Sequence, residues 1–292
     1  MATAALDIAV RRPKRESRWR RALRRHPTIV FGGTILGLMV LIAIFAPYLG
    51  TVDPQSVSPA RRLRWPQEQW WFGTDMMGRD VYSRTLYGAR ISLIVGLGAA
   101  ALATAGGLLL GLLTGFIRWF DAVLMRVMDG LMAIPAVLLA IALMALTKAS
   151  LENVIIAIAI AELPRVTRLV RGIVLTLREQ PYVEAATAAG TPLLRTLFKH
   201  ILPNTLAPLL VQGTFVCASA MITEAILSFI GAGTPPNIPS WGNIMSEARS
   251  IFQVAWYIVL FPGVFLSLTV LSVNLLGDGL RDLLDPRLSR RL

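Results

Sequence analysis

Long stretches without charged side chains are the feature that most constrains what this chain can fold into. Residues 28–49 and 91–117 contain no charged residue, and further apolar stretches follow toward the C-terminus. A helix that spans a bilayer needs about 17–25 mostly apolar residues. Charged residues make up only 16% of the 292 residues, whereas a soluble domain carries about a quarter. The sequence therefore predicts an all-α integral membrane protein.

Six membrane-spanning helices are expected. Their ranges are 28–49, 91–117, 127–147, 151–170, 206–230 and 256–277. Pro135 should kink the third helix, because a proline inside a helix removes a backbone hydrogen bond. The fourth helix is the most polar of the six. Its Glu162 and Arg165 are three positions apart, so they can pair on one helix face.

Three glycines distinguish the second helix. Gly107, Gly111 and Gly115 are spaced by four residues, so they share one face. Glycine on such a face lets another helix approach closely. Close packing is favoured over the alternative, a glycine-rich segment with no specific partner.

The distribution of basic residues gives the orientation. Residues 1–27 form an arm with nine Lys or Arg, which should lie in the cytoplasm or on anionic headgroups. With a cytoplasmic N-terminus, 21 Lys or Arg lie inside and 8 outside, as the positive-inside rule requires. The next segment, 28–90, then holds the first span and an extracytoplasmic loop. A five-helix core at 91–277 with a cytoplasmic loop at 179–205 precedes a cytoplasmic tail, 278–292.

Several functional classes are excluded by residue type. The net charge of +12 resides mostly in the arm, so it does not indicate nucleic-acid binding. One cysteine, Cys217, and two histidines, His26 and His200, give no expected metal site and argue against a metalloenzyme or an intramembrane serine–histidine protease. No Gly-x4-Gly-Lys-[Ser/Thr] loop is present to hold nucleotide phosphates. The chain is therefore expected to be neither an ATPase nor dependent on a cofactor of its own.

The loop at 179–205 has strong local signals. Pro181 suits the first turn of a helix, and the alanines after it favour helix. Gly190 suits a left-handed C-terminal cap. Thr191 and Pro192 should then begin a second helix as N-cap and first residue, and Pro203 should end the segment. The expected helix–turn–helix suits insertion into a groove on another protein, although local physics favours an ordinary surface loop equally.

The same loop carries a resemblance. Its Glu184-Ala185-Ala186, then Gly190, then Leu202-Pro203 resembles the coupling motif of binding-protein-dependent ABC importer permeases. His200 stands where that family often has an aliphatic residue. The resemblance implies that one set of residues contacts an ATPase subunit: Glu184, Ala185, Ala186, Gly190, Arg195, Leu202 and Pro203.

Two further stretches narrow the family. Residues 72–84 resemble the segment before the second helix of dipeptide, oligopeptide and nickel permeases, and 274–286 resemble their C-terminal end. The resemblance extends over about residues 28–288 and is to the second permease type. It implies a type I ABC importer permease fold in a bacterial inner (plasma) membrane, with both termini cytoplasmic. The transported solutes would be peptides or related small molecules.

The resemblance also implies the partners. A homologous second permease would complete a heterodimer, and two ATPase subunits would bind ATP and Mg²⁺. An extracytoplasmic binding protein would deliver the substrate, and lipid would surround the assembly. The extracytoplasmic motif supplies further site residues, namely Asp75, Gly78, Arg79, Asp80 and Arg84. Of these, Asp80 and Arg84 are four apart and can pair, and anchoring at the membrane surface is favoured over direct contact with a binding protein.

Two other readings stay open. An ion-coupled secondary transporter would use Glu162 and Glu224, because ionisable residues inside membrane helices are expensive and often functional. A passive scaffold or sensor is the third class. In the importer reading, Glu224 and Asn274 are expected to line or gate the translocation path. A helix–helix hydrogen bond is the equally weighted alternative.

Single cysteines on a Cys217→Ala background test the orientation. A membrane-impermeant thiol reagent added outside should label Gln67→Cys and Asn237→Cys, because both lie in expected outer loops. The same reagent should not reach Arg20→Cys, Thr187→Cys or Ser289→Cys until the membrane is permeabilised. External labelling at Thr187→Cys would overturn the topology and the coupling assignment with it.

Overall fold

The structure is a computed structural model that describes residues 27–284. Within that range every regular element is a helix, and only two isolated β-bridges occur. The predicted all-α fold is therefore confirmed. The basic arm up to residue 26, with His26, and the last eight residues of the tail lie outside the described residues.

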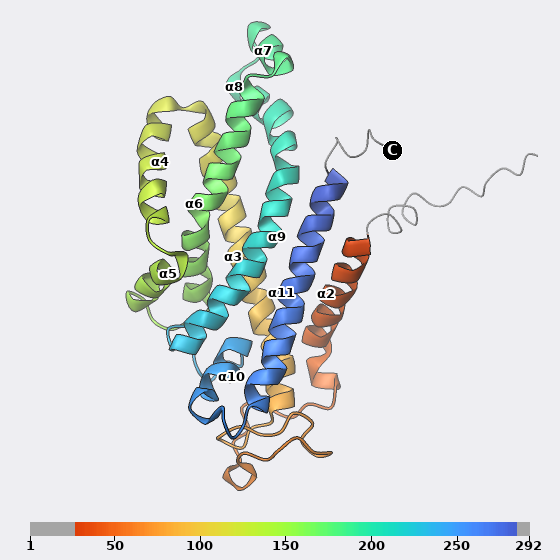
Figure 1. The fold of residues 1–292 in the computed structure, drawn as a ribbon. Coiled ribbons are helices and arrows are strands. Elements are labelled where there is room, and N and C mark those ends of the chain that lie inside the picture. The colour runs from red at the N-terminus through yellow and green to blue at the C-terminus, as the bar shows by residue number, and fades with distance from the viewer. Residues whose placement is uncertain (1–26, 285–292) are drawn as a thin grey trace, which may run out of the picture.

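Long helices form a bundle with short elements at both ends (Figure 1). In chain order the α-helices are α2 (Pro27–Phe45), α3 (Val81–Phe116), α4 (Arg118–Met132), α5 (Ala136–Ala145), α6 (Leu151–Arg178), α7 (Pro181–Ala188), α8 (Leu193–Thr196), α9 (Leu202–Ile230), α10 (Trp241–Glu247) and α11 (Tyr257–Leu284). Short turns η1 (Ala46–Tyr48), η2 (Pro59–Arg61), η3 (Leu197–Ile201) and η4 (Arg249–Ile251) connect them. The α7–α8 hairpin is at one end of the bundle, and residues 49–80 with α10 are at the other.

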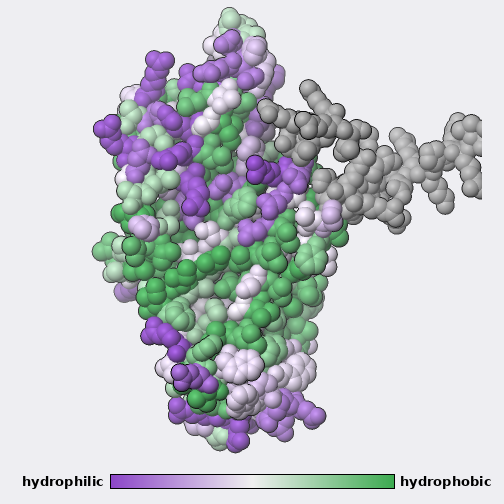
Figure 2. Space-filling view, in the orientation of Figure 1, coloured by the Kyte–Doolittle hydropathy of each residue, from purple (hydrophilic) through white to green (hydrophobic). Residues whose placement is uncertain are grey.

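The surface agrees with a membrane setting. Figure 2 shows a hydrophobic band around the middle of the visible face and hydrophilic residues toward both ends. Four described helical segments are long and apolar enough to cross a bilayer, and the bent pair α4–α5 makes a fifth if it is one span. α6 is too charged for that group, but its 28 residues run beside α3 through the bundle. Six passes are consistent with this arrangement.

Several boundaries differ from the expected ones. Pro135 does not kink one helix but separates two, α4 and α5, which meet at 94°. α3 begins ten residues before the expected start because Asp80 caps it at Val81. α6 and α11 continue to Arg178 and Leu284, beyond their apolar stretches. Hydropathy marks only the part of a helix that lies in lipid, so it misses turns that continue into water.

The glycine face of α3 packs directly on α6. A Cβ atom added at Gly107 would lie 2.5 Å from Val166, one at Gly111 would lie 2.6 Å from Val170, and one at Gly115 would lie 2.3 Å from Val174. Each valine also follows the previous one by four residues, so a ridge of valines fills the groove left by the glycines. The predicted close approach is confirmed.

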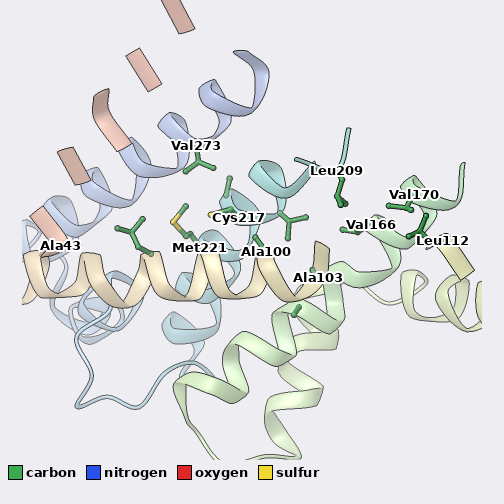
Figure 3. Close-up of a cluster of buried hydrophobic side chains, with 14 of the residues drawn as sticks. Ala43, Ala100, Ala103, Leu112, Val166, Val170, Leu209, Cys217, Met221 and Val273 are labelled. Atoms are coloured by element: carbon green, nitrogen blue, oxygen red, sulfur yellow. The ribbon is translucent and has the colours of Figure 1, made fainter. Parts of the chain in front are cut away.

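A second face of α3 packs on α9. Figure 3 shows Met221 and Cys217 of α9 beside Ala100 of α3, and Val273 of α11 and Ala43 of α2 belong to the same cluster. Small residues on α3 again set the spacing. α3 therefore contacts both α6 and α9, the two helices that are joined through the α7–α8 hairpin.

Two glycine variants test the α3–α6 contact. Gly111→Ala should lower the stability of the purified chain in detergent by about 1–3 kcal/mol, because its Cβ has no room beside Val170. Gly172→Ala on α6 is the matched control, since its Cβ would meet no atom within 4 Å. Thermal unfolding followed by tryptophan fluorescence compares them. Equal melting temperatures for the two variants would show that the glycine face is not a packing surface.

Candidate functional site

A capped turn at Gly190 joins α7 to α8 in the hairpin. Gly190 has φ +77°, in the left-handed region. The Gly190 N–H donates to the carbonyl of Thr187 at 3.0 Å, and the Thr191 N–H donates to that of Ala186 at 3.1 Å. These two bonds are the pattern of a Schellman cap. Because no atom lies within 4 Å of a Cβ added at Gly190, backbone conformation rather than space requires the glycine.

α7 offers most of its surface to the surroundings. Val183 is buried against the rest of the chain, whereas Glu184 and Ala185 are exposed and Ala186 is half-buried. Apolar side chains continue this exposed surface along the hairpin, at Tyr182, Leu193, Leu194 and Phe198. An exposed patch of this kind is typical of a protein–protein contact.

The second helix of the hairpin continues into the bundle, which corrects the expected ending at Pro203. α8 passes through the π-helical turn η3 into α9, and Pro203 lies in the first turn of α9. Pro192 rather than Thr191 is the N-cap residue of α8, and no side chain caps it. A proline in the first turn continues a helix because the missing N–H has no intrahelical partner there. α8, η3 and α9 are thus one continuous helical segment, Leu193–Ile230.

A cavity of about 620 Å³ separates the hairpin from the ends of α3 and α6. Arg178 and Phe116 line it on the bundle side, and Glu184 and Thr187 line it on the hairpin side. The Arg178 guanidinium donates to the carbonyl of Gly115 at 2.6 Å and lies over the Phe116 ring, 5.3 Å from its centroid. The ends of α3 and α6 are therefore tied together, while the hairpin projects from them.

At the opposite end, four charged side chains form a neutral cluster, the ionic quartet Asp75, Arg79, Arg84 and Glu247. Arg79 Nε and Arg84 Nη1 lie 2.7 Å and 2.6 Å from Asp75 Oδ2. Arg84 also donates to both oxygens of Glu247, at 2.5 Å and 2.9 Å, and Arg79 contacts Glu247 as well. Asp75 and Arg84 are 1% exposed, so the quartet joins the segment before α3 to α10 within the fold.

One expectation about this motif is wrong. Asp80 does not pair with Arg84: its carboxylate accepts from the Ser83 N–H at 2.8 Å and caps α3. Asp75, Arg79, Asp80 and Arg84 are all buried, so these four charged side chains brace the fold. Gly78 is equally structural, since a Cβ there would lie 1.9 Å from the carbonyl oxygen of Ser58.

Glu247 was missed by sequence reasoning. It lies 163 residues after Arg84, in a short helix with no pattern that marks a partner. Only the folded chain brings the two together.

The polar residues expected along the translocation path are not brought together. Glu224 is fully buried near the end of α9, where its Oε1 accepts from the Ser228 hydroxyl at 2.8 Å and lies 3.5 Å from that of Thr234. Asn274 is half-buried on α11, at a level roughly 15 Å away along the bundle by residue count. In this conformation the Glu224 side chain faces the interior of its own chain, and the role of Glu224 and Asn274 in lining or gating a path stays a prediction.

The remaining intramembrane acid bridges two helices. Glu162 of α6 accepts from the Ser219 hydroxyl of α9 at 2.8 Å. Arg165 lies 3.4 Å away on the exposed side, as the sequence spacing predicted. This arrangement neutralises Glu162 and ties α6 to α9.

Comparison with known proteins gives two family matches. Residues 107–290 match the family described as binding-protein-dependent transport system inner membrane component. Residues 17–66 match the N-terminal TM domain of oligopeptide transport permease C. The first match includes the α7–α8 hairpin, and the second includes α2.

Curated relatives extend over nearly the whole chain. The probable peptide ABC transporter permease protein y4tQ of Sinorhizobium fredii is 55% identical over 271 residues, 93% of both chains. The dipeptide transport system permease protein DppC of Alkalihalophilus pseudofirmus is 44% identical over 93% of this chain and 91% of its own. The glutathione transport system permease protein GsiD of Pectobacterium atrosepticum is 42% identical over 97% and 94%.

These matches and the fold agree with the resemblance in the three sequence motifs. The chain belongs to the binding-protein-dependent transport system inner membrane components, as an ABC importer permease of the dipeptide and oligopeptide type.

Proposed function

We propose that this chain forms half of the translocation pathway of an ATP-driven importer for peptides or related small solutes. The observation that carries the proposal is the continuity of α8, the second helix of the exposed hairpin, with α9. α7 joins α8 through the capped turn at Gly190, so a force applied at α7 would reach a membrane helix through a short, hydrogen-bonded connection. The names of the relatives, which include peptide, dipeptide and glutathione systems, support the substrate class.

The energy source is proposed to lie in separate chains. A homologous permease would complete the pathway as a heterodimer, and two ATPase subunits would bind ATP and Mg²⁺. A binding protein would deliver substrate outside. The orientation, with α7 and both termini in the cytoplasm of the bacterial cell, follows from the basic residues. The family does not support the alternative of an ion-coupled secondary transporter.

Docking of the ATPase is proposed to use the exposed surface of the hairpin. Glu184 lies in the first turn of α7, where the helix dipole favours a negative charge. Ala185 and Ala186 lose little side-chain entropy on contact. Arg195 is exposed on α8, and Leu202 and Pro203 join the hairpin to α9. The cavity behind the hairpin leaves room for it to move relative to α3 and α6.

For Glu224, burial changes the expected result of mutation. Glu224→Gln keeps an acceptor for Ser228 and Thr234, so uptake by the assembled transporter should stay close to wild type. Glu224→Leu removes the acceptor of the Ser228 hydroxyl at 2.8 Å and leaves it only the 3.4 Å contact with Thr234, which costs about 1–3 kcal/mol. It should lower both thermal stability and uptake. A large loss of uptake in Glu224→Gln with normal assembly would instead support a charge-dependent gating role.

The coupling assignment is tested at two residues. Gly190→Val imposes a left-handed conformation on a β-branched residue, at a cost of about 1–2 kcal/mol. Glu184→Lys places the wrong charge at the start of α7. Both variants should insert in the membrane, but they should retain roughly tenfold less ATPase, a loss of about 1.4 kcal/mol. Co-purified ATPase and uptake into vesicles measure this.

Glu179→Lys is the control for charge. Glu179 is exposed and lies five residues before Glu184, outside α7. Normal ATPase content and uptake in both Gly190→Val and Glu184→Lys would refute the assignment. Equal losses in Glu179→Lys would show an effect of net charge rather than of this helix.

A further inference from the structure

Residues 61–64 form a turn that is locked in place at the end of the bundle opposite α7. The Leu63 N–H donates to the carbonyl of Asp75 at 3.1 Å, and the Thr74 N–H donates to that of Arg64 at 3.0 Å. The Arg64 N–H donates to the Thr74 hydroxyl at 2.8 Å. Asp75 is itself a member of the ionic quartet. Hydrogen bonds to the buried residues Thr74 and Asp75 thus fix the backbone of the turn.

The turn also contains a strained residue. Leu63 has φ +53°, and it is the only non-glycine residue with positive φ in the described range 27–284. Its apolar side chain packs on the buried cluster around Val81 and Tyr257. Left-handed backbone costs such a residue about 1–2 kcal/mol and persists only where the surroundings enforce it.

The consequence of this conformation is the exposure of three arginines. With Leu63 turned inward, Arg61, Arg62 and Arg64 are all exposed. Arg61 lies over the Trp70 ring, 5.0 Å from its centroid, which restricts its motion. No salt bridge within the described residues involves these three side chains. Three guanidinium groups within four residues are thus presented on a rigid backbone.

The guanidinium groups of this surface favour a partner that carries carboxylates. Guanidinium groups bind carboxylates with two parallel hydrogen bonds, and a fixed backbone reduces the entropy lost on binding. The segment 49–80 extends past the ends of α2, α3 and α11 (Figure 1), and this end of the molecule is hydrophilic (Figure 2). That position favours a protein in the surrounding water over lipid headgroups.

We propose that Arg61, Arg62 and Arg64 form a docking site for a carboxylate-rich face of the extracytoplasmic binding protein. The inference rests on the proposed function, which requires such a protein. The ionic quartet and the strained Leu63 hold the site in position, while the arginines make the contact. Charges at the rim of an interface act mainly on association and make it depend on salt.

A matched pair of double variants tests the site in the complete transporter, reconstituted in zwitterionic phosphatidylcholine vesicles. Arg62→Gln with Arg64→Gln removes two positive charges from the turn. Gln67→Glu with Gln69→Glu lowers the net charge equally at exposed neighbours in the same segment. ATP hydrolysis is measured against the concentration of the cognate, substrate-loaded binding protein.

The arginine variant should need about three- to tenfold more binding protein for half-maximal stimulation. Its maximal and basal rates should be unchanged, and the shift should shrink at high salt. The glutamine control should stay within about twofold of wild type.

Three outcomes would overturn the site. No shift in the arginine variant, or an equal shift in the control, would exclude local docking. A shift that appears only when the vesicles contain phosphatidylglycerol would assign the arginines to lipid. If the binding protein fails to stimulate the wild-type transporter at all, the proposed function fails, and this inference fails with it.

Discussion

The close contact of α3 with α6 is the interaction on which the rest of the structure depends. Lipid is as apolar as the side chains of a membrane helix, so helices associate through close packing rather than burial from water. The glycines of α3 provide that closeness, and Val166, Val170 and Val174 fill the space they leave. α6 leads into α7, so the packing also places the α7–α8 hairpin. On its other face α3 contacts α9, where a Cβ at Gly96 would lie 2.6 Å from Met221.

A continuous set of contacts joins the two ends of the helix bundle. α9 is continuous with α8 of the hairpin at one end, and at the other it reaches Gly231 and the polar residues around Glu224. Asn243 of α10 joins that group by donating to the Thr234 hydroxyl at 2.9 Å. α10 is in turn held to α3 by the quartet through Glu247. Packed helices and hydrogen bonds therefore connect the hairpin end of the bundle to α10 at the opposite end.

Local signals were sufficient for much of this fold. The apolar stretches located the long helices, Gly190 was identified as a left-handed cap, and the glycine spacing identified a packing face, because each depends on residues close in sequence. The structural effect of Pro135 was underestimated, because the 94° bend between α4 and α5 depends on how both helices pack. Glu247 and the burial of Glu224 had no local signal, because both follow from contacts between distant segments. The family motif in residues 72–84 marked the segment as a candidate site. It did not indicate that the charged side chains of the segment are buried.

The quartet raises the question of why charges are buried where apolar residues would suffice. A buried ion pair gains little net stability, because desolvation offsets the attraction, whereas removing one partner costs about 3–5 kcal/mol. The directional contacts define one arrangement: Asp75 accepts from Arg79 and Arg84, and Glu247 contacts the same two guanidinium groups. Apolar side chains would provide no such directional contacts between the 49–80 segment and α10. The quartet instead sets the position of Asp75, hence of Leu63, and so determines where the exposed arginines meet the surrounding water.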